Sequence, residues 1–186
     1  MLKIIYDVDD TIWQLNRTIC NLYGLDCNRI KEYDITKTTV LTEEEKRILL
    51  ESYHNAEIFK LCQYNKGYER VFNLERLGLA NVYISSASLN EEIRKVKEYR
   101  LLKEIPNINK KHVKLTVGRN TYQGRVKGDI LIDDSPINIE KEDFKYNILI
   151  NQPYNYGIVF SKPVIRVDSL NQAVDVVEEF VRNDVK

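Results

Sequence analysis

The residues best suited to chemistry lie near the start of the sequence, where a cluster of carboxylates follows the apolar run at 2–6. Burying a carboxylate costs several kcal/mol unless a cation or hydrogen-bond donors compensate its charge. Asp7 and Asp9 are two residues apart, so in an extended chain they project to the same side. Such a pair could hold a divalent cation and leave one oxygen free to attack. The alternative is a strand-end turn in which Asp10 and Thr11 cap the next helix.

Polar residues also follow two later apolar runs. Ser85-Ser86 follows residues 81–84, and Asp133-Asp134 follows residues 129–132. In a parallel sheet the carboxyl ends of the strands share one edge, so these groups and Asp7 can converge there. The carboxylates would repel one another, and Mg²⁺, which binds carboxylates, waters and a substrate phosphate, would remove that repulsion.

The residue types indicate how such a site would handle a phosphate ester. The Ser86 hydroxyl and the adjacent amides, including that of Ala87, would bind phosphoryl oxygens at a helix N-terminus. A Lys or Arg from residues 119–127 would neutralise further phosphate charge. Asp7 would attack phosphorus as the nucleophile. Asp9 would act as general acid for the leaving alcohol and as general base for water.

Strands and helices alternate along the sequence, which is typical of a doubly wound parallel sheet. The predicted strands are 3–9, 81–84, 113–117, 129–132, 147–150 and 164–167, and the predicted helices are 15–23, 42–53, 67–77, 89–105 and 168–182. Residues 13–65 carry helical patterns without a convincing strand. The predicted fold is therefore a three-layer α/β core of residues 1–12 and 66–186, with a small helical cap of residues 13–65 inserted after the first strand.

The composition limits the class of protein. Hydrophobic residues make up 43% of the 186 positions and charged residues 30%, as in a globular protein with a real core. Lys plus Arg and Asp plus Glu number 28 each, which argues against a dedicated nucleic-acid binder. No apolar run has the length of a membrane span, and we read no signal peptide, so a cytoplasmic location is expected.

Cysteine and histidine chemistry is not expected. Cys20, Cys27 and Cys62 have no metal-binding spacing, and without a secretory signal we expect reduced thiols. His54 and His112 are far apart in sequence and predict no zinc site.

The order of these segments resembles the haloacid dehalogenase superfamily of phosphohydrolases. Residues 7–11 match its first motif, Val82-Tyr83-Ile84-Ser85-Ser86 matches the second, and Leu131-Ile132-Asp133-Asp134 matches the fourth, a paired-acid metal motif. The resemblance implies a Rossmann-like core, Mg²⁺ as cofactor and an aspartyl-phosphate intermediate on Asp7. The implied metal ligands are Asp7, Asp9, Asp133 and Asp134, and similarity favours Asp134 over Asp133 for direct contact.

A closer resemblance, over nearly the whole chain, is to the 5'(3')-deoxyribonucleotidase family. It rests on residues 131–139, on residues 148–155, and on residues 56–59 followed by Gly67. That family removes phosphate from deoxynucleoside monophosphates with Mg²⁺, and a small helical cap lines its base pocket.

Two positions depart from the family pattern. The third-motif lysine usually lies further before the paired acids than Lys127 does, and Gln123 falls near its place. Lys127 or Arg125 would serve instead as phosphate-binding groups, with Arg119 a weaker candidate. Asp10 stands where better-known members carry a small residue.

Aromatic side chains of the cap could stack on a base, or they could pack the cap together. Trp13, close to the nucleophile, and Phe59, in the cap match, are the preferred candidates for the substrate pocket. The other candidates are Tyr23, Tyr33, Tyr53 and Tyr64. Residues 151–155 could form a structural turn or could close the site, and we favour the turn, because Pro and Asn make turns without a ligand.

The resulting prediction is a phosphoric monoester hydrolase whose partner is a small-molecule nucleotide, a nucleoside or deoxynucleoside monophosphate. Two alternatives stay open. One is a phosphatase of another small phosphoester or of a nucleic-acid 3' phosphate, and the other is a catalytically idle domain that binds a nucleotide or a protein. We expect no membrane association and no stable nucleic-acid partner, and a homodimer is left open.

Overall fold

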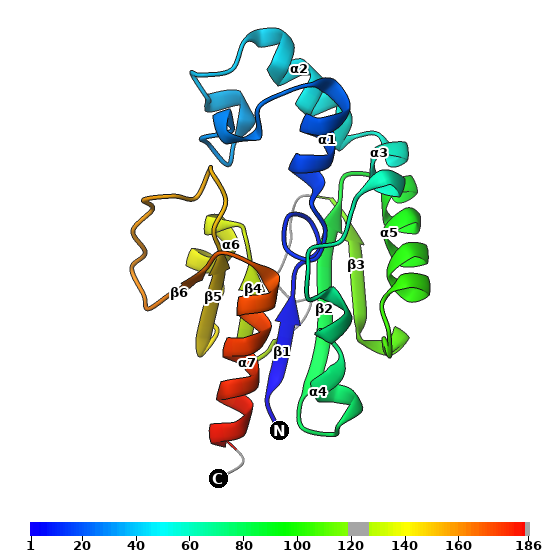
Figure 1. Cartoon of the computed structure of the whole chain (residues 1–186), viewed down its shortest axis with the longest axis vertical. Coiled ribbons are helices and arrows are strands. Elements are labelled where there is room, and N and C mark those ends of the chain that lie inside the picture. Colours follow the sequence, from blue (N-terminus) through cyan, green and yellow to red (C-terminus); the bar gives the residue numbers. More distant parts are fainter. Residues whose placement is uncertain (119–126, 185–186) are drawn as a thin grey trace.

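The computed structural model describes residues 1–118 and 127–184, and within them six parallel strands form one sheet (Figure 1). The strands are β1 (Lys3–Tyr6), β2 (Asn81–Ser88), β3 (Val113–Val117), β4 (Ile130–Asp133), β5 (Tyr146–Ile150) and β6 (Ile165–Val167). Their order in the sheet is β3-β2-β1-β4-β5-β6. From β1, the strands β2 and β3 follow toward one edge of the sheet, and β4, β5 and β6 follow toward the other edge. The point at which the strand order reverses therefore lies between β1 and β4.

Helices cover both faces of the sheet because its strands are apolar on both. Ile4 and Tyr6 of β1 face one cluster, which includes residues of α4 (Asn73–Arg76), α5 (Glu91–Glu104) and α7 (Leu170–Asp184). Ile5 faces a smaller cluster on the other side, with Ile139 of α6 (Pro136–Lys141). The predicted three-layer, doubly wound fold is confirmed.

The first part of the chain between β1 and β2, from α1 to α3, lies over the carboxyl ends of the strands (Figure 1). It contains α1 (Leu15–Tyr23), α2 (Glu43–Tyr53), α3 (Ala56–Leu61) and the short 3₁₀ turns η1 (Cys27–Arg29) and η2 (Ile35–Lys37). The Thr42 hydroxyl accepts the Glu45 N–H at 3.2 Å, and the Glu45 carboxylate accepts the Thr42 N–H at 2.7 Å. This capping box begins α2 where the sequence predicts it.

The two ends of the predicted cap segment pair with each other. The Gln14 N–H donates to the Gln63 carbonyl at 2.9 Å, and the Asn65 N–H donates to the Ile12 carbonyl at 2.7 Å. Arg100 of α5 then ties the end of α3 to the core, because its guanidinium donates to two α3-end carbonyls at 2.8 Å each. The division into core and cap at residues 13–65 stays a prediction.

Three local predictions differ from the structure. The predicted helix 67–77 is divided into η3 (Tyr68–Arg70) and α4. β2 continues through Ser88 because Ser85 to Ser88 pair with β3. The short helices α3 and α6 were not predicted. Across the described parts of the chain, no helix combines the length and the apolar character that a membrane crossing requires.

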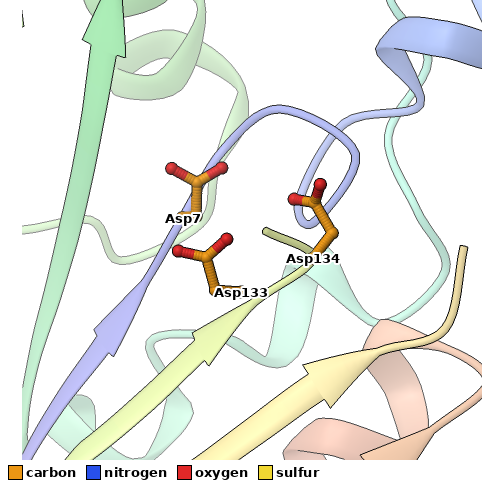
Figure 2. Close-up of side chains that lie close together, drawn as sticks. All are labelled: Asp7, Asp133 and Asp134. Carbon is orange, nitrogen blue, oxygen red and sulfur yellow. The ribbon is translucent and has the colours of Figure 1, made fainter. Parts of the chain in front are cut away.

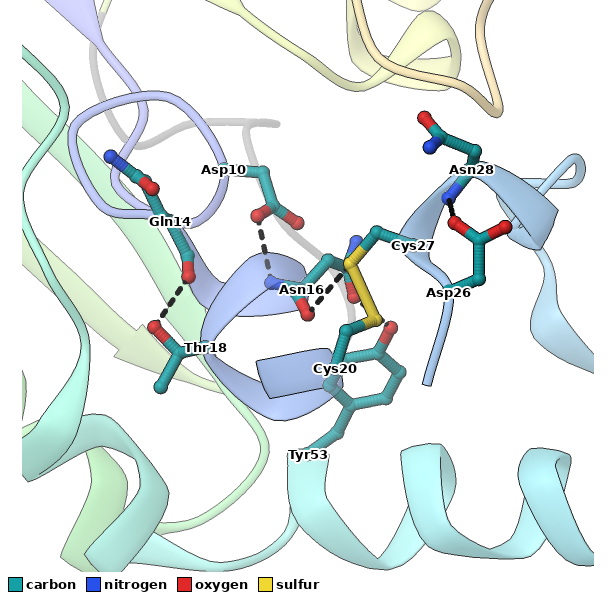
Figure 3. The surroundings of a disulfide bond; sticks show 9 residues. All are labelled: Asp10, Gln14, Asn16, Thr18, Cys20, Asp26, Cys27, Asn28 and Tyr53. Carbon is teal, nitrogen blue, oxygen red and sulfur yellow. Dashed lines mark hydrogen bonds between the residues drawn. A yellow bond between two sulfur atoms is a disulfide. The ribbon is translucent and has the colours of Figure 1, made fainter. Parts of the chain in front are cut away.

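The expectation of reduced cysteines is wrong for one pair. Cys20 of α1 and Cys27 of η1 are joined in a disulfide, with their Cα atoms 5.8 Å apart (Figure 3). Cys62 is a free, buried thiol. The left-handed Gly24 that ends α1 turns the chain back, so two cysteines that are remote along an extended chain meet.

Candidate active site

The end of β1 is followed by a tight turn that exposes its carboxylates to the sheet edge. The Asp7 N–H still donates to the Ile132 carbonyl of β4, at 3.0 Å, so Asp7 lies beside the end of that strand. The Val8 carbonyl then accepts the N–H groups of residues 11, 12 and 13 at 3.3, 2.9 and 2.8 Å. Asp10 takes the left-handed conformation, with φ at 55°, which allows the chain to turn upward into α1.

The turn brings Asp7 together with Asp133 and Asp134 (Figure 2). One carboxylate oxygen from each lies within 4.8 Å of the others. Asp133 is held by the Ser135 N–H at 2.7 Å and by the Asn138 amide at 3.1 Å. Burial, and then the charges of Asp133 and Asp10, raise the pKa of Asp134 well above its usual range.

This group of three carboxylates fits a divalent cation. All the donors are hard oxygens, and the buried Asp134 carboxylate lies close to the carboxylates of Asp7 and Asp133. Mg²⁺ suits this set because it takes a few carboxylates and completes its shell with water and phosphate oxygens. Asp7, Asp133 and Asp134 are the residues that would hold it.

Asp9, the fourth expected ligand, contributes no carboxylate to this cluster. Its carboxylate instead forms an ion pair with the ammonium of Lys97, a fully buried residue of α5. The same ammonium donates to the Ser86 hydroxyl at 3.1 Å and to the Ala87 carbonyl at 2.7 Å. Lys97 therefore connects the predicted acid/base residue with the predicted phosphate-binding segment.

These groups border one cavity of about 270 Å³. It is lined by the carboxylates of Asp7, Asp9, Asp10, Asp133 and Asp134, by Ser86 and Ala87, by Ser135 and Asn138 of the α6 start, by Tyr154, and by Leu15, Asn16, Ile30, Tyr33, Ile35 and Tyr53 from the chain above the sheet. The cavity thus has an acidic floor, a side formed by Ser86 and Ala87, and a partly aromatic roof.

Asp10 links the floor to the roof. Its carboxylate accepts the Asn16 N–H at 2.8 Å in the first turn of α1, although the residue at the N-cap position is Gln14 and not Asp10 or Thr11 (Figure 3). The Asn16 side chain in turn accepts the Tyr53 hydroxyl at 2.5 Å. Burial raises the pKa of Asp10 to about 7, and the nearby charge of Asp9 acts in the same direction.

Several predicted site residues lie elsewhere. Lys127 is exposed and is not part of the cavity lining, and Arg119, Gln123 and Arg125 lie outside the described residues. Trp13 is fully buried with the Arg100 guanidinium 4.9 Å from its ring, and Phe59 is buried with its ring 5.3 Å from the Lys97 ammonium. Neither aromatic ring lines the cavity.

Lys97 and Tyr154 are the site residues that sequence reasoning missed. Lys97 occupies the apolar stripe of α5 between Ile93 and Leu101, four residues from each, and all three are buried. A lysine at such a position was a readable signal, because lysine is almost never fully buried without a partner. Tyr154 follows a turn-forming proline and carried no comparable signal.

No protein-family model matches this chain, and no curated protein sequence matches it significantly. Solved structures do share its fold at low identity. A haloacid dehalogenase-like family hydrolase from Streptococcus pneumoniae has a TM-score of 0.56 and 13% identity, covering 97% of this chain and 98% of its own. CbbY from Rhodobacter sphaeroides, in complex with phosphate, has a TM-score of 0.52 and 11% identity, covering 92% and 96%. A hydrolase from Pseudomonas syringae has a TM-score of 0.52 and 11% identity, covering 96% and 99%. The chain therefore has the fold of haloacid dehalogenase-like hydrolases.

Proposed function

We propose that this protein is a Mg²⁺-dependent phosphomonoesterase that acts on nucleoside or deoxynucleoside monophosphates. The observation that carries the proposal is the placement of Asp7 beside Asp133 and Asp134 in a cavity that also holds Ser86 and Asp9. A nucleophile, an acid/base group and phosphate-binding donors then surround one space, at the sheet edge where ligands of open α/β folds bind.

The proposed reaction has two displacements at phosphorus. An Asp7 oxygen attacks phosphorus, the ester P–O bond breaks, and the departing oxygen takes a proton from Asp9. Water then attacks the phosphorus of the Asp7 acyl phosphate and gives a proton to Asp9, which releases phosphate and restores Asp7. Bound Mg²⁺ would neutralise charge on the substrate phosphate and the carboxylates. Lys97 would orient Asp9 and add positive charge next to Ser86.

The roof of the cavity supports a nucleotide as the substrate. Tyr33 and Tyr53 offer aromatic surface, and Asn16 offers polar atoms near them. Flat rings with polar edges suit such a wall. The volume of about 270 Å³ lies near the lower end of small-molecule sites, which favours a single nucleotide over a polymer. The proposed partner is therefore a small molecule.

An assay of phosphate release with Mg²⁺ tests the proposal on a panel of ribonucleoside, deoxyribonucleoside and sugar monophosphates. The variant Asp7→Asn should lower turnover of nucleotides by at least about 10³-fold, because the amide is not a nucleophile. Its melting temperature should equal or exceed that of the wild type, because one charge leaves the repelling cluster. Asp143→Asn, the same change at an exposed position, is the matched control.

Wild-type turnover by Asp7→Asn would contradict the role of Asp7. Release of phosphate from sugar phosphates alone would overturn the nucleotide substrate, and no release from any ester would favour a catalytically idle domain.

A further inference from the structure

The segment between β5 and β6 reaches the carboxylate cluster from one edge of the sheet, whereas α5, which carries Lys97, lies against β2 and β3 toward the other edge (Figure 1). The Asn155 side-chain amide donates to the Asp134 carbonyl and to the Ile150 carbonyl, both at 2.9 Å. The Gln152 amide donates to the Asp10 carbonyl at 3.0 Å. Residues 151–155 are therefore hydrogen-bonded to two segments that border the cavity floor, one at Asp10 and one at Asp134.

Tyr154 in this segment contacts a carboxylate of the cluster directly. Its ring is buried, with 6% exposed, and its hydroxyl donates to one Asp134 oxygen at 2.5 Å. The Thr11 hydroxyl donates to the other Asp134 oxygen at 3.0 Å. Each oxygen of this carboxylate thus has one donor, and the two donors come from different segments, which fixes the plane of the group.

The Tyr154 ring also packs against a residue of the cavity roof. The ring of Tyr33 packs edge-on against it with the centroids 5.7 Å apart. Tyr33 lies in the chain between β1 and β2 and lines the cavity roof. Tyr154 therefore stands between the roof of the cavity and Asp134, with packing on one side and a charge-assisted hydrogen bond on the other.

We propose that Tyr154 is a positioning residue that holds Asp134 in the orientation in which it can share a divalent cation with Asp7 and Asp133. The inference rests on the proposed function only in taking that cation to be Mg²⁺. Hydrogen-bond donors behind a ligating carboxylate fix its direction, and their removal commonly costs about 10- to 100-fold in metal affinity.

The variant Tyr154→Phe tests this role because it removes the hydroxyl and keeps the ring that packs on Tyr33. Binding of Mg²⁺ to the intact protein is measured by titration calorimetry, and binding of Mn²⁺ by electron paramagnetic resonance, both without substrate. We expect affinity to fall by about 10- to 100-fold while the circular dichroism spectrum is retained. Tyr156→Phe is the matched control, since Tyr156 lies in the same loop with 74% of its surface exposed, and it should bind the ions as the wild type does.

A second variant tests the same carboxylate through its other hydrogen-bond donor. Thr11→Val removes the other donor to Asp134, so it should also weaken ion binding, and the double variant should lose less than the sum of the two. Wild-type affinity in Tyr154→Phe, or equal losses in Tyr154→Phe and Tyr156→Phe, would overturn the inference. So would a wild-type protein that binds neither ion. A protein that binds the ions but hydrolyses no phosphate ester would contradict the proposed function and leave the role of Tyr154 standing.

Discussion

Lys97 carries its charge inside the protein because three acceptors surround it. The Asp9 carboxylate, the Ser86 hydroxyl and the Ala87 carbonyl together use the donors of the ammonium group. Two of these acceptors belong to residues with proposed chemical roles, so the position of this cation is tied to the site. We infer that Lys97 supplies the positive charge that the sequence assigns to residues 119–127.

The variant Lys97→Met separates a functional role from a structural one. Methionine fills similar volume but leaves Asp9, Ser86 and Ala87 without their common donor, so the melting temperature should fall by several degrees and turnover is compared well below it. Asp9 keeps contact with solvent, because 28% of its side chain is exposed. Turnover should fall by about 10²-fold or more, because Asp9 loses the cation that orients it for proton transfer. Phosphate release and thermal denaturation are the measurements.

Lys127→Met is the comparison that decides between the two lysines. Lys127 is exposed, so this variant should keep nearly full activity. Loss of activity in Lys127→Met together with normal activity in Lys97→Met would return the phosphate-binding role to the sequence-based candidate.

The residues of the site were predictable to the extent that they follow apolar runs of the sequence. Asp7, Ser86 and Asp133-Asp134 each follow an apolar run, and the common edge of a parallel sheet brings them together. Lys97 and Asp9 are 88 positions apart, and nothing local in either segment indicates that they meet. Tyr154 could not be assigned because its ring reaches Asp134 only through the path of a loop. Trp13 failed as a pocket candidate because nearness in sequence does not decide which way a side chain points.

Among the elements, the disulfide between Cys20 and Cys27 makes a measurable contribution to stability. It closes a loop with a sequence separation of 7, for which chain entropy gives a stabilisation of about 2 kcal/mol. Reduction should lower the melting temperature by about 4 to 8 °C in a protein of this size. Cys20→Ser should melt at the same temperature as the reduced wild type.

Alkylation of the denatured protein counts the free thiols. Without reductant one label per chain is expected, on Cys62, and three after reduction. Three labels without reductant would show that the pair is not oxidised. Disulfides are rare in cytosolic proteins, so the result of this labelling also bears on the expected cytoplasmic location, which stays a prediction.

The longer elements were predicted well because their patterns repeat over enough residues. All six strands, α1, α2, α5 and α7 lie within a few residues of their predicted positions. The missed helices α3 and α6 have 6 residues each, too few for a helical period to show. β2 extends past its prediction because its last serines gain hydrogen bonds from β3, a tertiary contact that outweighs their polar character.

At the scale of the whole molecule, the carboxylates on the cavity floor make stability depend on pH and on metal. Burial raises the pKa of Asp10 to about 7 and that of Asp134 well above its usual range, whereas both titrate near 4 in an unfolded chain. A carboxyl group whose pKa is higher in the folded than in the unfolded state contributes to the free energy of unfolding. This contribution is complete below about pH 4 and is lost as the pH rises through the folded-state pKa. Without metal, the melting temperature should therefore fall between pH 5 and about pH 8.

Mg²⁺ should reverse this loss. An ion at 100 times its dissociation constant stabilises the folded protein by about 2.7 kcal/mol, and we expect the largest gain at the highest pH. Thermal denaturation in chelator and in Mg²⁺, across pH, measures both effects. Asp134→Asn should melt higher than the wild type in chelator at pH 8 and gain little from Mg²⁺. A melting temperature that is flat or rises with pH in chelator would contradict the repulsion argued from the carboxylates.

The paired chain segments at the base of the predicted cap bear on how such a protein could diversify. The chain leaves the core next to Gln14 and returns next to Gln63, and these two residues are hydrogen-bonded to each other. The hydrogen bonds of this junction do not involve the residues between Gln14 and Gln63, and each doubling of loop length costs only about 0.6 kcal/mol in closure entropy. We expect this junction to accept exchanged segments of other lengths, which would let one hydrolytic centre acquire new specificities by descent or by grafting.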